Sequence, residues 1–317
     1  MLSFGLIALQ VLAAGALPDR FDTRDFQQPR QSEADVQEGG GGGGGGGCPA
    51  VWREIRANLW PRFAGCSRGA SFAIRFAFHD AATTSKSTPF YAPAAGGADG
   101  SLLLNDEEAA RADNDPLQAF RGNLTEVYTQ YHASHNISAA DLVQFAGNLG
   151  TRACAGGPLV RTWVGRKDNS AAAPPGLLPP GFGPGADADS LIGLFADKGI
   201  SAQDLAALIG AHSVSQAFAQ QINGIPAAGS QDSTPTVWDT VYYSEVLDSK
   251  NETGVFDFES DRNLAADGTT RPFFERYARS VRAWNADFVV AMEKLSLLGI
   301  PQADRARFVD CTSVIAG

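Results

Sequence analysis

The chain has 317 residues, with 35 glycines, 4 cysteines and a formal net charge of −10. This length suits one large domain or two smaller ones, and a hydrophobic content of 44% excludes collagen, coiled coil and wholesale disorder. Nucleic acids and anionic membranes are poor partners for so acidic a chain, because both bind basic patches. The cysteines are too few for a disulfide scaffold, and no Cys-x-x-Cys spacing indicates structural zinc.

The first 47 residues read as a leader followed by an arm. Residues 1–16 form an apolar run that ends in small residues and precedes a charged stretch, which predicts a signal peptide. Residues 17–47 are polar and end in nine consecutive glycines, so we expect a flexible arm that buries nothing. A compact domain is predicted over 48–317, and no further apolar run in it is long enough to cross a membrane.

A signal peptide places the chain in an oxidising, extracellular environment. The four cysteines are then expected to form two disulfides, for which three pairings are possible. Asn123, Asn136 and Asn251 each begin an Asn-x-Ser/Thr triplet, which is compatible with glycosylation of a secreted protein.

Hydrophobic periodicity predicts four long helices, in chain order over 70–79, 138–150, 201–221 and 272–298. Ser138 and Ser201 are predicted N-caps, each with an aspartate three positions later. Strand signals are few. Long loops are expected near 81–101, 169–189 and 223–240, and loops of this length need something besides a core to hold them.

Two of the four histidines are candidates for catalysis, whereas His132 and His135 lie in a polar stretch and are predicted to be surface residues. A histidine on an apolar helix face is usually only a buried side chain with its hydrogen bonds satisfied. His79, however, follows Arg75 by one helical turn, so both project from one face, which Phe78 keeps dry. A neutral imidazole beside a fixed guanidinium can move a proton while negative charge is stabilised, which suits cleavage of a peroxide bond.

Three motifs in the correct order carry a family resemblance, which covers nearly all of residues 48–317. The chain resembles the secreted fungal (class II) haem peroxidases of the plant-type superfamily, specifically in Arg75-Phe-Ala-Phe-His79-Asp80, Gly97-Ala-Asp99-Gly-Ser101 and Gly210-Ala-His212-Ser213. The resemblance implies an all-α fold in which a distal and a proximal helical half enclose haem b. It also implies hydrogen peroxide as a substrate and a monomeric enzyme.

The resemblance assigns five residues to the haem site. His79 matches the distal acid–base catalyst, and Arg75 matches the residue that stabilises the transition state of peroxide cleavage. Asn114 matches the asparagine that orients the distal imidazole. His212 matches the proximal iron ligand, and Asp261 matches the carboxylate that accepts a hydrogen bond from its other nitrogen.

Two oxygen-rich segments, each starting directly after a functional histidine, resemble the family's calcium sites. The distal set would be Asp80, Gly97 (carbonyl), Asp99 and Ser101. The proximal set would be Ser213, Asp232, Thr234, Val237 (carbonyl) and Asp239. Ordinary turns also contain such residues, but hard oxygen ligands at alternating positions suit Ca²⁺ better.

The resemblance also implies the disulfide pairing. Cys66 would pair with Cys154 and Cys48 with Cys311, which is fewer bridges than typical class II members have.

Several positions depart from the family pattern. Manganese-oxidising members carry three carboxylates where this chain has Arg68, Phe72 and Phe218, so that site is expected to be absent. Members that oxidise bulky aromatics have a surface tryptophan where this chain has Ala207. We therefore expect a general-purpose peroxidase that oxidises small phenols at the haem edge. The family's aromatic residue before Asp232 is Gln231 here: either the loop aligns differently or the proximal pocket is more polar.

Two other functions are compatible with parts of this pattern. One is a secreted protein on the same scaffold that binds haem or calcium without turnover, although all five residues of the proposed haem site are present. The other is an intracellular peroxidase of the cytochrome c or ascorbate type, which conflicts with the signal peptide, the glycosylation triplets and the paired cysteines.

Overall fold

The computed structural model describes residues 47–87, 96–217, 228–248 and 255–317. Within these ranges the regular structure is helical, except for one antiparallel pair of two-residue strands, β1 (Trp163–Val164) and β2 (Val309–Asp310). The all-α prediction is confirmed. The proposed signal peptide and nearly all of the proposed arm lie outside the described residues.

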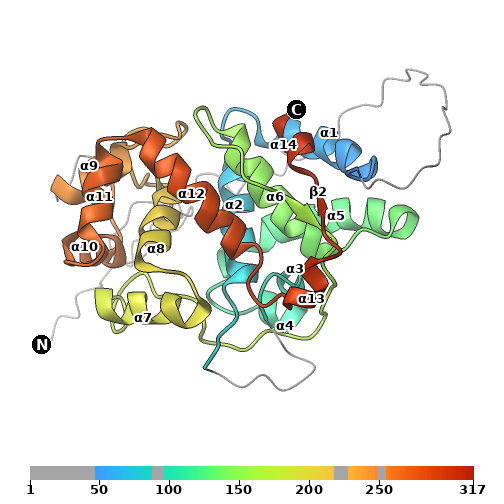
Figure 1. Ribbon diagram of the computed structural model, residues 1–317, viewed down its shortest axis with the longest axis horizontal. Coiled ribbons are helices and arrows are strands. Elements are labelled where there is room, and N and C mark those ends of the chain that lie inside the picture. Colours follow the sequence, from blue (N-terminus) through green and yellow to red (C-terminus); the bar gives the residue numbers. More distant parts are fainter. Residues whose placement is uncertain (1–46, 88–95, 218–227, 249–254) are drawn as a thin grey trace, which may run out of the picture.

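The helices form two groups, seen on the right and left of Figure 1. The first group comprises α1 (Val51–Phe63), α2 (Arg68–Ala81), α3 (Ser101–Leu104), α4 (Asp106–Ala109), η2 (Asp115–Leu117), α5 (Gln118–His135) and α6 (Ala139–Ala153). The second comprises α7 (Ala188–Lys198), α8 (Ala202–Ile209), η3 (Gly210–Val214), α9 (Val241–Asp248), α10 (Glu259–Ala266) and α11 (Arg271–Ala278).

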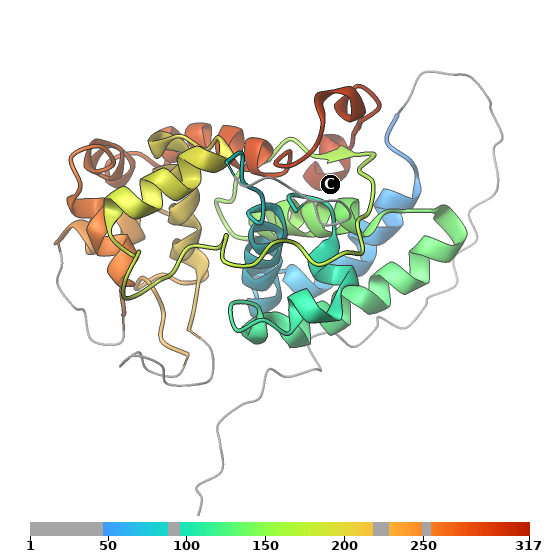
Figure 2. The same ribbon diagram turned by 90° about the horizontal axis from the view of Figure 1, so that it is seen from below.

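Helix α12 (Val281–Leu295) links the two groups. It packs along α8 and runs toward the first group, where the chain ends with α13 (Gln302–Arg305) and α14 (Thr312–Ala316) (Figures 1 and 2). α14 packs against α1, so both ends of the described chain lie in the first group of helices. None of the described helices combines the length and apolarity needed to span a bilayer.

Helices α2 and α6 make the closest packed pair in the first half, and two glycines of α6 permit this approach. A Cβ at Gly147 would lie 2.6 Å from the Ala77 Cβ, and one at Gly150 would lie 2.6 Å from the Ala70 carbonyl oxygen. Because backbone cannot move aside as a side chain can, Gly150 fixes the distance at which α2 lies. This packing positions the helix that carries Arg75 and His79.

Replacing Gly150 by alanine should therefore destabilise the protein, although alanine favours helix over glycine. We expect a loss of about 1–3 kcal/mol from overpacking. Gly122, on the exposed side of α5, has no atom within 4 Å of an added Cβ and provides the matched control. Gly122→Ala should stabilise by up to about 1 kcal/mol. Thermal unfolding measures both changes; equal effects of the two substitutions would contradict this account of the α2–α6 contact.

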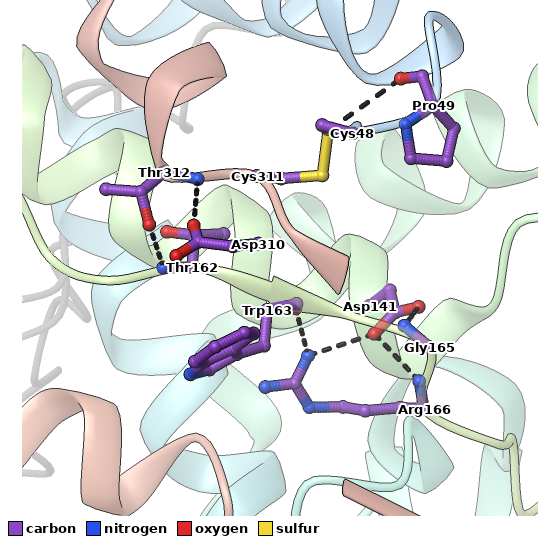
Figure 3. The surroundings of a disulfide bond; sticks show 10 residues. All are labelled: Cys48, Pro49, Asp141, Thr162, Trp163, Gly165, Arg166, Asp310, Cys311 and Thr312. Carbon is purple, nitrogen blue, oxygen red and sulfur yellow. Dashed lines mark hydrogen bonds and ion pairs between the residues drawn. A yellow bond between two sulfur atoms is a disulfide. The ribbon is translucent and has the colours of Figure 1, made fainter. Parts of the chain in front are cut away.

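Both disulfides implied by the resemblance are present. Cys66 bonds to Cys154 and Cys48 bonds to Cys311. The second joins the start of the described domain to its end, beside the β1–β2 pair (Figure 3). There the Thr312 hydroxyl accepts a hydrogen bond from the Thr162 amide at 2.9 Å.

A buried ion pair near this disulfide holds α6 in place. Arg166 Nη1 lies 2.9 Å from Asp141 Oδ1, and both side chains are almost fully buried (Figure 3). The same guanidinium donates to the Ser296 carbonyl at the end of α12. Removing one partner of a buried ion pair lowers the free energy of unfolding by about 3–5 kcal/mol. The Arg166–Asp141 pair therefore contributes to the stability of the first group of helices.

The structure confirms two predicted helices and corrects two. Helices α2 and α6 match the predictions over 70–79 and 138–150, and Ser138 caps α6 as expected. The helix predicted over 201–221 is shorter, since α8 ends at Ile209 and a 3₁₀ turn follows; residues 218–221 lie outside the described residues. The helix predicted over 272–298 is two helices, α11 and α12, because Ser280 adopts an extended conformation and caps α12.

Candidate active site

A cavity of about 400 Å³ lies between the two halves. One wall is the face of α2 that carries Arg75, Phe78 and His79, and the opposite wall includes His212. The remaining lining is largely apolar and includes Leu191, Phe195, Leu205, Leu208, Phe258 and Met292. A flat, mostly apolar macrocycle with one iron and two propionates along one edge fits this type of cleft. The structure thus brings both candidate histidines to one cavity.

The distal residues form a hydrogen-bonded series. Arg75 Nε donates to His79 Nε2 at 3.1 Å, and His79 Nδ1 lies 2.8 Å from Asn114 Oδ1. An amide oxygen only accepts, so Nδ1 carries the proton and Nε2 keeps its lone pair. The Asn114 amide in turn donates to the Glu108 carbonyl at 2.9 Å. These contacts fix the imidazole as a neutral base with its lone pair beside the guanidinium.

Burial sets the protonation state of this series. It lowers the pKa of His79 to about 3, with the charge of Arg75 adding to the effect and the Asn114 hydrogen bond opposing it. Burial also lowers the pKa of Arg75 to about 10, which still leaves the guanidinium charged at neutral pH. The site therefore holds a neutral imidazole next to a fixed cation.

The proximal residues form a second hydrogen-bonded group. His212 Nδ1 lies 3.1 Å from Asp261 Oδ2, and the Gln231 amide Nε2 lies 3.1 Å from that same oxygen. Asp261 and Gln231 are both buried. With Nδ1 engaged by the carboxylate, Nε2 is the nitrogen of His212 available to a metal.

Three separate segments meet to build this group. Gln216 and Ser230 form a β-bridge beyond His212, and Ser230 also bridges to Val255. These bridges place residue 231 between the turn that holds His212 and the helix that holds Asp261. The structure thus resolves the alternative left open by the sequence: Gln231 lies beside the proximal histidine, and the pocket is polar there.

Some residues of the site could not be recognised from their own sequence context. Phe258 contacts the His212 ring edge-on, with centroids 5.6 Å apart, and Phe195 stacks on Phe78 at 6.2 Å. Glu108 supplies a backbone carbonyl, and any residue type has one. The only local sequence feature near Glu108 is the helix cap at Asn105, whose side chain accepts a hydrogen bond from the Glu108 amide. This cap predicts the start of a helix but not the contact with Asn114.

The residues of the distal calcium prediction gather around buried oxygen atoms. Asp80 is fully buried and its carboxylate accepts from the amides of Gly100 and Leu102. Asp99 Oδ2 and Ser101 Oγ are buried without a hydrogen-bond partner among the described residues. Burial, then the charges of Asp99 and Glu108, raises the pKa of Asp80 well above its usual range. A bound cation would satisfy these oxygens and relieve the repulsion between the carboxylates.

The residues of the proximal calcium prediction show the same features. Ser213 Oγ and Asp232 Oδ2 are buried without a partner in the part of the chain that the structure describes. Thr234 Oγ1 lies 3.1 Å from Asp239 Oδ1. Burial, opposed by a hydrogen bond from the Thr234 amide, raises the pKa of Asp232 to about 7. The described residues hold no cluster of three metal-binding His, Cys, Asp or Glu side chains, so a cation at either set would need hydroxyl and carbonyl oxygens as well.

The comparisons with known proteins agree with this geometry. The family model described as "Peroxidase" matches residues 55–280, which is more than half of the chain and includes both histidines. The chain belongs to the peroxidase family. It is 30% identical to a versatile peroxidase of Pleurotus eryngii over 285 residues, covering 83% of this chain and 72% of the relative.

Other fungal relatives show similar identity. The chain is 31% identical to a peroxidase of Arthromyces ramosus over 289 residues, which cover 84% of this chain and 75% of the relative. It is 31% identical to manganese peroxidase H4 of Phanerodontia chrysosporium over 274 residues, which cover 79% of this chain and 68% of the relative. The resemblance to class II fungal peroxidases is confirmed. The protein is a haem-dependent peroxidase, and the non-catalytic scaffold is not supported.

Three of the four substrate-site positions that depart from the family pattern lie within the described residues. The Arg68 guanidinium lies 5.6 Å from the centre of the Phe72 ring and donates to the Ala217 carbonyl at 3.2 Å. Phe218 lies outside the described residues. Ala207 is fully buried, and its carbonyl accepts from Trp284 Nε1 at 2.9 Å.

Proposed function

We propose that the protein is a secreted peroxidase that reduces hydrogen peroxide and oxidises small phenols and other small aromatic donors, with two structural calcium ions. The observation that carries the peroxide chemistry is the Arg75–His79–Asn114 series facing a cavity shared with the His212–Asp261 pair. When bound, haem supplies the iron that binds peroxide and receives its oxidising equivalents. His212 Nε2 would hold that iron.

The distal residues move the protons. His79 Nε2 accepts a proton from hydrogen peroxide, and its Nδ1 proton stays on the hydrogen bond to Asn114. Arg75 stabilises the negative charge that develops on the departing oxygen. His79 then returns the proton to that oxygen, which leaves as water. One peroxide becomes two waters in a full turnover, and two donor molecules each lose one electron and one proton.

This assignment predicts an unusual pH profile. An imidazole with an ordinary pKa near 6.5 loses its function as a base as the pH falls through that value. Because the pKa of His79 is lowered to about 3, the base stays neutral and competent well below pH 6.5. We expect the second-order rate constant for peroxide, measured by stopped-flow absorption, to be nearly constant from about pH 7 to about pH 5. A decline centred near pH 6.5 would show that the base is not buried as described.

The choice of small aromatic donors is supported by the residues at the two alternative substrate sites. A cationic side chain stacked on a phenyl ring, as in Arg68 and Phe72, offers no ligand to Mn²⁺. A buried alanine at position 207 offers no surface residue to oxidise. Steady-state assays should show saturable oxidation of a simple phenol and no saturable oxidation of Mn²⁺ at micromolar metal. Saturable Mn²⁺ oxidation would contradict the proposal.

Secretion is supported by the apolar leader at residues 1–16 and by the two disulfides, which persist in oxidising compartments. Expression of the full chain in a secreting host, followed by N-terminal sequencing, tests it. We expect the mature protein in the medium to begin after residue 16. A chain that is retained in the cell with an intact leader would contradict secretion.

A further inference from the structure

Gln231 makes a contact with the proximal pair that the reaction described above does not require. Its Nε2 lies 3.1 Å from Asp261 Oδ2 and 3.1 Å from His212 Nδ1, and only 1% of the residue is exposed. His212 Nδ1 lies 3.1 Å from the same carboxylate oxygen. Two nitrogen atoms from different segments therefore converge on one oxygen.

The chemistry of the three groups determines which atom donates. If Nε2 of His212 is the metal ligand, Nδ1 carries the proton and donates to Asp261, so it has no lone pair for Gln231. The Gln231 amide must then donate to Asp261 Oδ2. The opposite amide orientation would place two negatively polarised oxygens against each other, so the assigned orientation is the favourable one.

Two hydroxyl groups also lie near this carboxylate. Burial, then the negative charge of Asp261, raises the pKa of the Tyr242 hydroxyl well above its usual range. The Ser260 hydroxyl lies nearer the other carboxylate oxygen, 3.4 Å from Oδ1. Tyr242 and Phe258 face the His212 ring edge-on at 5.8 and 5.6 Å. Asp261 is fully buried, and in such low-dielectric surroundings a hydrogen bond to a carboxylate is electrostatically stronger than in water.

We propose that Gln231 is a positioning residue that raises the reduction potential of the haem iron by competing with His212 for Asp261. This inference rests on the proposed binding of haem iron by His212. A carboxylate that accepts one hydrogen bond draws the Nδ1 proton strongly and makes the imidazole a better electron donor to the metal. The second donor withdraws part of that negative charge. The imidazole then donates less, and the ferrous state is favoured relative to a protein without the amide.

The test compares the reduction potentials of haem-loaded variants. Gln231→Leu removes the donor, and Gln231→Met does so with an unbranched side chain if leucine disturbs folding. Gln144→Leu is the matched control, because Gln144 is an equally buried glutamine whose amide donates to the Ala77 carbonyl at 3.1 Å in the distal half. Spectroelectrochemical titration should show the ferrous-to-ferric ratio at a fixed potential falling about tenfold in either Gln231 variant. For a one-electron couple this is a decrease of about 59 mV.

A second readout reports on the iron–histidine bond itself. Resonance Raman spectra of the ferrous protein should show the iron–histidine stretching frequency rising in Gln231→Leu and remaining unchanged in Gln144→Leu. A merely structural role for Gln231 would lower stability without moving this frequency. An unchanged or increased reduction potential in both Gln231 variants would overturn the proposal.

Failure of this inference and failure of the proposed function give different results. A folded wild-type protein that does not bind haem contradicts the proposed function, whereas haem-loaded Gln231 variants with wild-type potentials contradict only the role of Gln231. Should neither variant retain haem, the wild-type ferric protein labelled with ¹⁵N-glutamine provides the test by nuclear magnetic resonance. We expect one side-chain amide with paramagnetically shifted, slowly exchanging protons. Absence of such an amide would contradict the proposal.

Discussion

His79→Leu should retain haem and slow the reaction with hydrogen peroxide by about 10²–10⁴-fold, the usual contribution of a general acid–base. Leucine fills much of the buried space but has no nitrogen to accept the peroxide proton. His212, Gln231 and Asp261 are untouched by the change, so binding of the iron on the other side is expected to persist. Stopped-flow measurement of the Soret band after mixing with peroxide gives the rate.

The control for this substitution is a histidine outside the cavity. His132 is exposed on α5 and its Nδ1 lies 2.8 Å from the Ile137 carbonyl. His132→Leu should react with peroxide at the wild-type rate. If His79→Leu reacts as fast as this control, proton transfer by His79 is refuted. If His79→Leu loses haem, the rate of His79→Gln, which keeps a polar side chain, is compared with the same control to test proton transfer.

Removal of calcium should have the largest effect on stability. At a free calcium concentration about 1,000 times its dissociation constant, each site contributes about 4 kcal/mol to the free energy of unfolding. Four buried oxygens have no hydrogen-bond partner among the described residues: Asp99 Oδ2, Ser101 Oγ, Ser213 Oγ and Asp232 Oδ2. We expect the Tm to rise with free Ca²⁺ and to fall when a chelator is added. Because His79 and His212 each directly precede a proposed calcium ligand, the Soret band should change as well.

Variants separate the two calcium sites. Asp232→Asn should reduce the dependence of Tm on calcium by removing one carboxylate from the proximal site. Asp189→Asn removes an exposed carboxylate of α7 and should leave that dependence intact. A Tm that is independent of calcium in the wild-type protein would contradict both sites. The buried carboxylates would then have to be neutral, as the raised pKa of Asp232 allows.

The sequence predicted those parts of the site that depend on short-range geometry. Arg75 and His79 are four residues apart on a strongly periodic segment, and a helix places such residues on one face. The caps at Ser138 and Ser201 were likewise predictable, because a capping serine and the aspartate three residues later interact locally. The relation of His212 to Asp261 came from the family resemblance, since 49 residues separate them.

Features that depend on tertiary contacts were not predictable. The helix predicted to continue through His212 ends near Gly210, where a Cβ would lie 2.2 Å from the Tyr243 hydroxyl and 2.7 Å from the Trp284 ring. Local periodicity carries no information on that contact. The role of Gln231 is a similar case: the residue was recognised as unusual, but only the β-bridges at Ser230 place its amide on the proximal carboxylate.

The central claim is that this cavity binds haem between His79 and His212. Titration of the folded, secreted protein with haemin, followed by absorption spectroscopy, tests it most directly. We expect a Soret band that saturates at one haem per chain, shifts on addition of hydrogen peroxide and is lost or strongly altered in His212→Ala. A correctly folded protein that develops no Soret band, or a His212→Ala variant with the wild-type spectrum, would contradict the account.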